Sequence, residues 1–105
     1  MAQGDLTKEI EYDKIEVVST WNIQVRKATK VMEEQADGPK REMTRSFHRH
    51  VLTPFRSEKG EDGKWTHTAT DISGEDASVQ AIANAAWTDD VKTAYKTFQE
   101  SQTTP

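Results

Sequence analysis

The sequence predicts an α+β fold, in which an antiparallel meander of three or four strands is covered on one face by two C-terminal helices. Two stretches, residues 22–33 and 45–54, alternate between apolar and polar side chains with the two-residue period of a strand. Asp37, Gly38 and Pro39 lie between them and are typical turn residues. After residue 73 the apolar residues recur at helical spacing instead.

The first strand is expected from Lys8 to Val18, after a flexible segment at residues 1–7. Its alternation breaks between Tyr12 and Ile15, which favours a bulge there. A tight connection at residues 19–21 leads into the second strand. Pairing Val17 with Ile23 also places Ile15 opposite Val25.

This register predicts that one face of the three strands is apolar and the other is polar. Pairing Val25 with Val51 extends it to the third strand. The buried face is then expected to carry Ile15, Val17, Ile23, Val25, Val31, Phe47 and Val51. The opposite face, open to water or to a partner, is expected to carry Lys14, Glu16, Gln24, Arg26, His48 and His50.

Pro54 should end the third strand, because proline cannot donate to a strand ladder. Residues 56–64 are expected to form a charged loop with two glycines. The stretch 65–72 alternates and is rich in threonine. It is either a fourth strand that returns as a hairpin near Phe55, or a further part of the loop.

Two short amphipathic helices are predicted at the C-terminal end. Ser73 and Thr88 are the expected N-caps, and acidic residues follow each of them. The predicted helical stripes are Val79, Ile82, Ala83 and Ala86, and then Val91, Ala94, Tyr95 and Phe98. Trp87 is expected at their junction as a core residue, and residues 101–105 should be flexible. The length of the chain predicts that 1–105 forms a single domain.

Composition excludes several classes of protein. There is no cysteine, which removes disulfide scaffolds and thiolate metal sites. The first residues do not resemble a signal peptide, and no apolar run has the length of a membrane span. The net charge is −4, which disfavours a general nucleic-acid binder.

The charge is unevenly distributed along the chain. Residues 22–56 hold eight Lys or Arg and four Asp or Glu, and the remainder holds six basic and fourteen acidic residues. This split fits a basic hairpin beside acidic segments of the same chain, and it also fits head-to-tail packing between copies.

The histidines are the candidate metal ligands. His48 and His50 share one strand face, and His67 could add a third imidazole if its segment folds back. Arg26 and Arg49 lie nearby and oppose a cation, so a solvated polar face is the competing interpretation. No cofactor is expected.

No catalytic constellation emerges from the sequence. Ser46 beside His48, or Ser57, could serve as a nucleophile, but no aspartate is placed to orient a histidine. No glycine-rich phosphate motif occurs. The sequence therefore predicts a protein that is not an enzyme.

Protein–protein contact is the expected mode of action. The candidate partner-binding residues are Arg26, His48, Arg49 and His50 on the polar face, with Trp21 and Trp65 in turns or loops, where a large aromatic side chain can anchor a partner. The two tryptophans could equally cap the ends of the core. Nucleic-acid binding is disfavoured because Phe47 is expected to be buried, which leaves no stacking platform.

The runs IEYDKIEVV, IQVRKAT, RSFHRHVLTP and SGEDASVQAIANAAWTDDVKTAYKTF resemble small uncharacterised proteins of marine tailed phages, including those of cyanobacteria. The resemblance covers about residues 9–99, and the chain departs from it by a longer segment at 56–70. Such proteins are encoded among virion and tail-fibre genes. The resemblance therefore implies a virion-associated or accessory protein, located in the particle or the host cytoplasm, that binds itself or other phage structural proteins.

Overall fold

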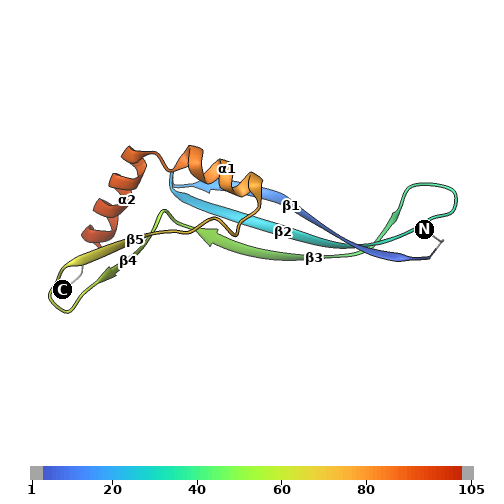
Figure 1. The fold of residues 1–105 in the computed structure, drawn as a ribbon, viewed down its shortest axis with the longest axis horizontal. Coiled ribbons are helices and arrows are strands. Elements are labelled where there is room, and N and C mark those ends of the chain that lie inside the picture. Colours follow the sequence, from blue (N-terminus) through green and yellow to red (C-terminus); the bar gives the residue numbers. More distant parts are fainter. Residues whose placement is uncertain (1–3, 103–105) are drawn as a thin grey trace. The chain divides into compact units, whose positions relative to one another are not determined.

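The computed structural model describes residues 4–102 and confirms the α+β class (Figure 1). The first sheet has three antiparallel strands in the order β1-β2-β3, and a second sheet pairs β4 with β5. The elements are β1 (Leu6–Val18), β2 (Asn22–Glu33), β3 (Arg41–Leu52), β4 (Phe55–Lys59), β5 (Trp65–Ala69), α1 (Ala77–Ala86) and α2 (Asp89–Ser101).

The first strand begins at Leu6, two residues earlier than expected, because backbone hydrogen bonds of Gly4 and Asp5 with Glu34 extend the ladder. The Gly4 N–H donates to the Glu34 carbonyl, and the Glu34 N–H donates to the Asp5 carbonyl. Of the ends expected to be flexible, 1–7 and 101–105, residues 1–3 and 103–105 lie outside the described residues. The prediction is wrong for Leu6 and Thr7, which belong to β1, and for Ser101, which belongs to α2.

The chain forms two compact units. The first contains Met1–Ile15 and Val25–His50, and the second contains Glu16–Gln24 and Val51–Pro105.

In the first unit, the relation of β1 to β2 differs from the predicted register. Asp13 and Arg26 hydrogen-bond side chain to side chain, so they lie on the same face of the sheet. Because side chains alternate along a strand, Ile15 shares that face and Val25 points to the other. The predicted pairing of Ile15 with Val25 is therefore wrong, since an offset of one residue reverses every side chain of a strand.

The third strand is also reversed relative to the prediction. Phe47 is 44% exposed and Val51 is 57% exposed, although both were expected to be buried. Val17 is exposed as well, whereas Ile23 and Val25 are fully buried as predicted. The Arg26 guanidinium lies over the Phe47 ring, so Phe47 lies on the face of the sheet that carries Asp13 and Arg26 and not on the face that carries Val25.

The turn between β1 and β2, in the second unit, accounts for this offset. Ser19 and Thr20 both have positive φ, at 56° and 69°. Positive φ at two successive turn residues is the mark of a type I′ turn, which places Val18 opposite Trp21. The predicted pairing of Val17 with Ile23 needs one more loop residue than this turn supplies.

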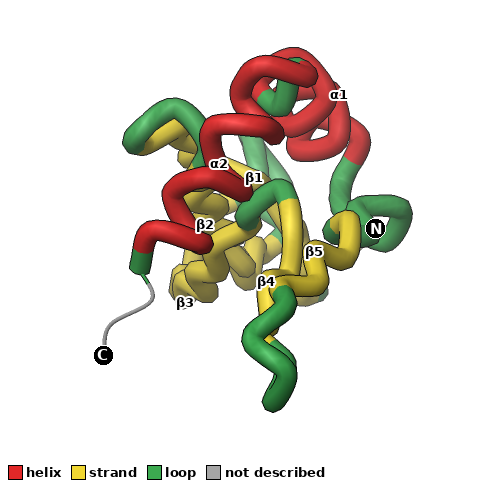
Figure 2. Tube along the Cα trace, turned by 90° about the vertical axis from the view of Figure 1, so that its left-hand side faces the viewer, coloured by secondary structure: helices red, strands yellow, loops and turns green. Residues whose placement is uncertain are grey.

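The predicted fourth strand is confirmed as β5, which forms a hairpin with β4 (Figure 2). Phe55 pairs with Ala69 and Ser57 pairs with His67. The expected loop at 56–64 is wrong in its first half, because residues up to Lys59 belong to β4. Gly63 has a φ of +80° in the connecting turn, a conformation that glycine adopts without steric cost.

The helices of the second unit follow the predicted stripes in part, since Ala94 and Phe98 of the predicted α2 stripe are exposed. Val79 and Ala83 of α1 and Tyr95 of α2 are buried, and Trp87 between the helices is buried as predicted. Thr88 caps α2 by accepting a hydrogen bond from the Val91 N–H, as expected. The predicted cap at Ser73 is wrong, since Asp76 accepts from the Ser78 N–H and α1 begins after it.

Candidate functional site

An exposed aromatic ring in the first unit is contacted by two arginines. The guanidinium carbon of Arg26 lies 4.5 Å from the centre of the Phe47 ring, and that of Arg49 lies 5.7 Å from it. Guanidinium groups at such distances are attracted by the ring's quadrupole. We call Arg26, Phe47 and Arg49 the Phe47 patch. It unites two predicted partner-binding residues with a side chain that was expected to be buried.

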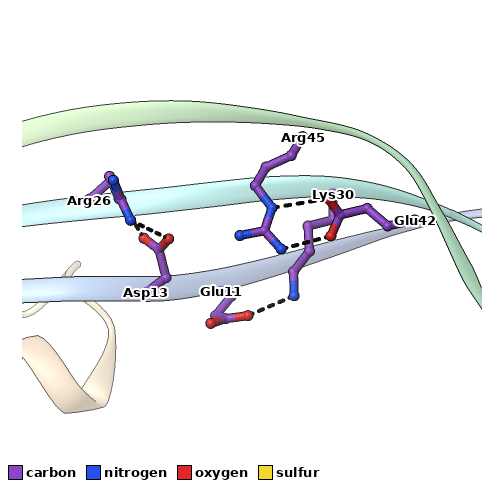
Figure 3. A network of polar contacts seen from close by, with 6 residues as sticks. All are labelled: Glu11, Asp13, Arg26, Lys30, Glu42 and Arg45. Carbon is purple, nitrogen blue, oxygen red and sulfur yellow. Dashed lines mark hydrogen bonds and ion pairs between the residues drawn. The ribbon is translucent and has the colours of Figure 1, made fainter.

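Arg26 of the Phe47 patch also takes part in one of three ion pairs on the three strands (Figure 3). Asp13 accepts two hydrogen bonds from Arg26, at 3.0 and 2.8 Å. Lys30 donates to Glu11 at 2.7 Å. The network is completed on β3 by Arg45, which donates to both carboxylate oxygens of Glu42, at 3.2 and 2.7 Å.

These contacts shift the ionisation of the groups that make them. The hydrogen bond from Arg26 lowers the pKa of Asp13, and the same bond raises the pKa of Arg26. Likewise, the hydrogen bond from Arg45 lowers the pKa of Glu42. All four groups are charged at neutral pH, so the network adds little net charge of its own to the surface.

Ala28 lies between Arg26 and Lys30 on the same side of β2, and it is fully buried. A methyl group is small enough to fit below the neighbouring long side chains. Lys and Arg commonly cover apolar surface with their methylene stems while the charged ends stay solvated.

Arg49 differs from Arg26 and Arg45 in its partners. Arg26 and Arg45 are both bound to carboxylates. Within residues 4–102, Arg49 has no carboxylate at ion-pair distance, and its contact is with Phe47. Arg49 is therefore available to an anionic group of a partner.

The two histidines of β3 are close to one another. Their ring centres are 6.2 Å apart, His48 is exposed and His50 is partly buried. Among the described residues, no three His, Cys, Asp or Glu side chains are grouped as a metal site would require. His67 belongs to the second unit, where both of its ring nitrogens have protein partners.

The two candidate tryptophans lie in the second unit. Trp21 packs edge-on against Tyr95, with ring centres 5.5 Å apart, and lies 5.3 Å from Phe98. Its carbonyl accepts a hydrogen bond from Trp87 Nε1 at 2.8 Å. Trp65 stacks on His67 at 6.0 Å, on a strand and not in a loop. These contacts give both residues a packing role.

A second cluster joins the β4–β5 hairpin to α2. Ser57 Oγ lies 2.7 Å from His67 Nδ1, and Glu100 Oε2 lies 2.8 Å from His67 Nε2. The His67 side chain is only 10% exposed. In serine hydrolases the carboxylate binds Nδ1 and the serine faces Nε2, and here the two partners are exchanged. The cluster ties a helix to a hairpin through a histidine whose two nitrogens are both satisfied.

Sequence reasoning missed Asp13 and Phe47 as members of the candidate surface. The Ser-Thr pair after Val18 gives no signal for a type I′ turn, which prefers Asn and Gly. A two-residue turn there would have placed Asp13 opposite Arg26. Glu100 was missed because contacts across 33 residues leave no local pattern.

Comparison with known proteins adds no assignment. No protein family, no curated protein and no solved structure matches this chain. Among the described residues, neither helix is long and apolar enough to cross a membrane.

Proposed function

We propose that this chain is a non-enzymatic, virion-associated or accessory phage protein that acts through protein–protein contacts. The observation that carries the proposal is the exposure of Phe47 and Val51 on an outer strand, where Phe47 contacts Arg49, an arginine with no acidic partner among residues 4–102. Outer strands carry backbone groups that can pair with another chain, and exposed apolar side chains on them favour association.

The phage context comes from the resemblance of the sequence and gives the setting of this contact. In it, the partners are further copies of the chain or other structural proteins of the particle. Candidate locations are the virion and the host cytoplasm.

The test compares a phage that encodes the wild-type chain with phages that encode Phe47→Ser or Arg49→Glu. We expect mass spectrometry of purified particles to detect the wild-type chain and to show a loss of at least about tenfold for either variant, because each removes part of the Phe47 patch. Lys59→Glu is the matched control, since it reverses an exposed charge on β4. A pull-down from infected cells, with the wild-type chain as bait, is the second measurement. Absence of the wild-type chain from particles, together with a pull-down that retains no protein, would overturn the proposal.

A further inference from the structure

The two outer strands of the three-stranded sheet carry opposite charge. β1 holds two lysines and four acidic residues, for a net charge of −2. β3 holds three arginines and one glutamate, for a net charge of +2. The strands have similar lengths, 13 and 12 residues, and each is hydrogen-bonded only to β2 within the described sheet. By the charges of their own side chains, the two outer strands are therefore opposite in sign and similar in length, an acidic edge and a basic edge, and three carboxylates of β1 also pair with Arg26, Lys30 and Lys40.

Individual groups on these edges retain bonding capacity. Glu9 accepts one hydrogen bond, from Lys40 to Oε2, and Glu11 accepts one, from Lys30 to Oε1. Their side chains are 43% and 51% exposed, so the second oxygen of each carboxylate can still accept. On the basic edge, Arg49 has donors without an acidic partner among the described residues.

Apolar side chains are exposed on both edges as well. Leu6 and Ile10 are exposed on β1, and Met43 and Phe47 are exposed on β3. Strand addition between the two edges would satisfy the outer backbone groups and cover apolar surface at the same time.

We infer that copies of this chain associate head to tail, with the β3 edge of one copy paired to the β1 edge of the next. The inference rests on the proposed function and names its partner as a second copy. Pairing β3 with β3 of another copy would bring two strands of charge +2 together, and like charges directly opposite destabilise a sheet. Because the contact joins two different surfaces, it leaves one edge open at each end and repeats into a chain.

Two variants that each block one edge test this arrangement by light scattering over a range of concentrations. Arg49→Glu reverses the basic edge and keeps β1 intact, whereas Glu11→Lys reverses the acidic edge and keeps β3 intact. The mass of the wild-type protein should grow past that of a dimer, and each variant alone should associate about tenfold or more weakly. An equimolar mixture should regain association, because the intact β3 of one variant meets the intact β1 of the other, and the two reversed charges are also opposite in sign.

Neutral variants keep the test valid if a reversed charge prevents folding. Arg49→Gln and Glu11→Gln should each associate more weakly than the wild type, with a smaller loss than the reversed charges cause, and should regain association when mixed. Circular dichroism verifies that each variant is folded. Lys59→Glu should associate like the wild type.

Three results would overturn the inference. Dimers of Glu11→Lys alone, with monomeric Arg49→Glu, would indicate a symmetric β3–β3 contact. Wild-type association that neither variant changes would place the contact on another surface and leave the proposed function intact. A wild-type protein that stays monomeric at every concentration would remove self-association, and the particle experiment would then decide the proposed function separately.

Discussion

Asp13 and Arg26 face each other across β1 and β2 in a two-pronged contact, with both carboxylate oxygens bound by guanidinium nitrogens at 3.0 and 2.8 Å. Arg26 also lies over Phe47, so one side chain connects all three strands of the sheet. This geometry fixes which side chains share a face. It therefore decides that Phe47 is exposed beside two arginines and is not part of the core.

The Asp13–Arg26 contact should make stability depend on acidity. The pKa of Asp13 is lowered by its hydrogen bond to Arg26, so the contact stabilises the fold fully above the unfolded-state value of about 3.9. The stabilisation is lost as the pH falls through the lower, folded-state pKa. Urea unfolding should show a constant gap between wild type and Asp13→Asn from pH 7 to about pH 5, and a shrinking gap below about pH 4. Asp37→Asn, in an exposed turn, should show no such gap, and an unchanged gap at pH 2 for Asp13→Asn would contradict the assignment.

The turn after β1 should be open to stabilisation. Thr20 is β-branched at a φ of 69°, where such residues are strained. Ser19→Asn with Thr20→Gly supplies the Asn-Gly pair that type I′ turns prefer, and should raise the free energy of unfolding by about 1 kcal/mol. Thr29→Gly, inside β2, should lower it, because glycine weakens a strand interior. Thermal melts of the three proteins measure this, and a destabilised Asn-Gly variant would argue against the type I′ turn.

Two isoleucines of the sheet should respond differently to the same substitution. Ile23 is fully buried, so Ile23→Ala should reduce the free energy of unfolding by about 2–5 kcal/mol. Ile10 is exposed, so Ile10→Ala should change it by less than about 0.5 kcal/mol. Chemical denaturation compares the two. Equal losses would show that the assignment of faces is incorrect.

The Trp87–Trp21 contact should stabilise the second unit. Trp87→Phe removes the hydrogen bond from Nε1 to the Trp21 carbonyl and leaves a small void in the core. The expected loss in unfolding free energy is about 1–3 kcal/mol. Trp65→Phe is the matched control, because Trp65 is less buried and a phenyl ring can still stack on His67. A larger loss for Trp65→Phe than for Trp87→Phe would contradict this account.

In the Ser57–His67–Glu100 cluster, Ser57 should not react as a catalytic nucleophile. The carboxylate and the hydroxyl bind the ring nitrogens in the reverse order of a serine hydrolase, so we expect no covalent labelling of Ser57 by a fluorophosphonate. Intact-mass spectrometry after incubation measures the adduct, with Ser57→Ala as the control for labelling elsewhere. An adduct at Ser57 that disappears in His67→Ala would contradict the non-enzymatic proposal.

Local patterns predicted several elements correctly. The period of two in β2 and the helical spacing of Val79, Ala83 and Tyr95 placed buried residues where the structure has them. Thr88 as a cap followed from its hydroxyl and the two acids after it. These features depend on residues within a few positions of one another, and the sequence records them directly.

Relations between distant segments were decided by the tertiary structure alone. A choice between a two-residue and a three-residue turn after Val18 reverses every side chain that follows, and apolar residues at Val17, Ile23 and Phe47 were compatible with either. The burial of His67 between Ser57 and Glu100 likewise depends on contacts of 10 and 33 residues in sequence separation. By itself the sequence determined the class of fold, the helices and the opposite charges of β1 and β3. The register placed Arg49 and Phe47 together on the surface, because strand pairing is set by the geometry of the turn and by ion pairs across the sheet.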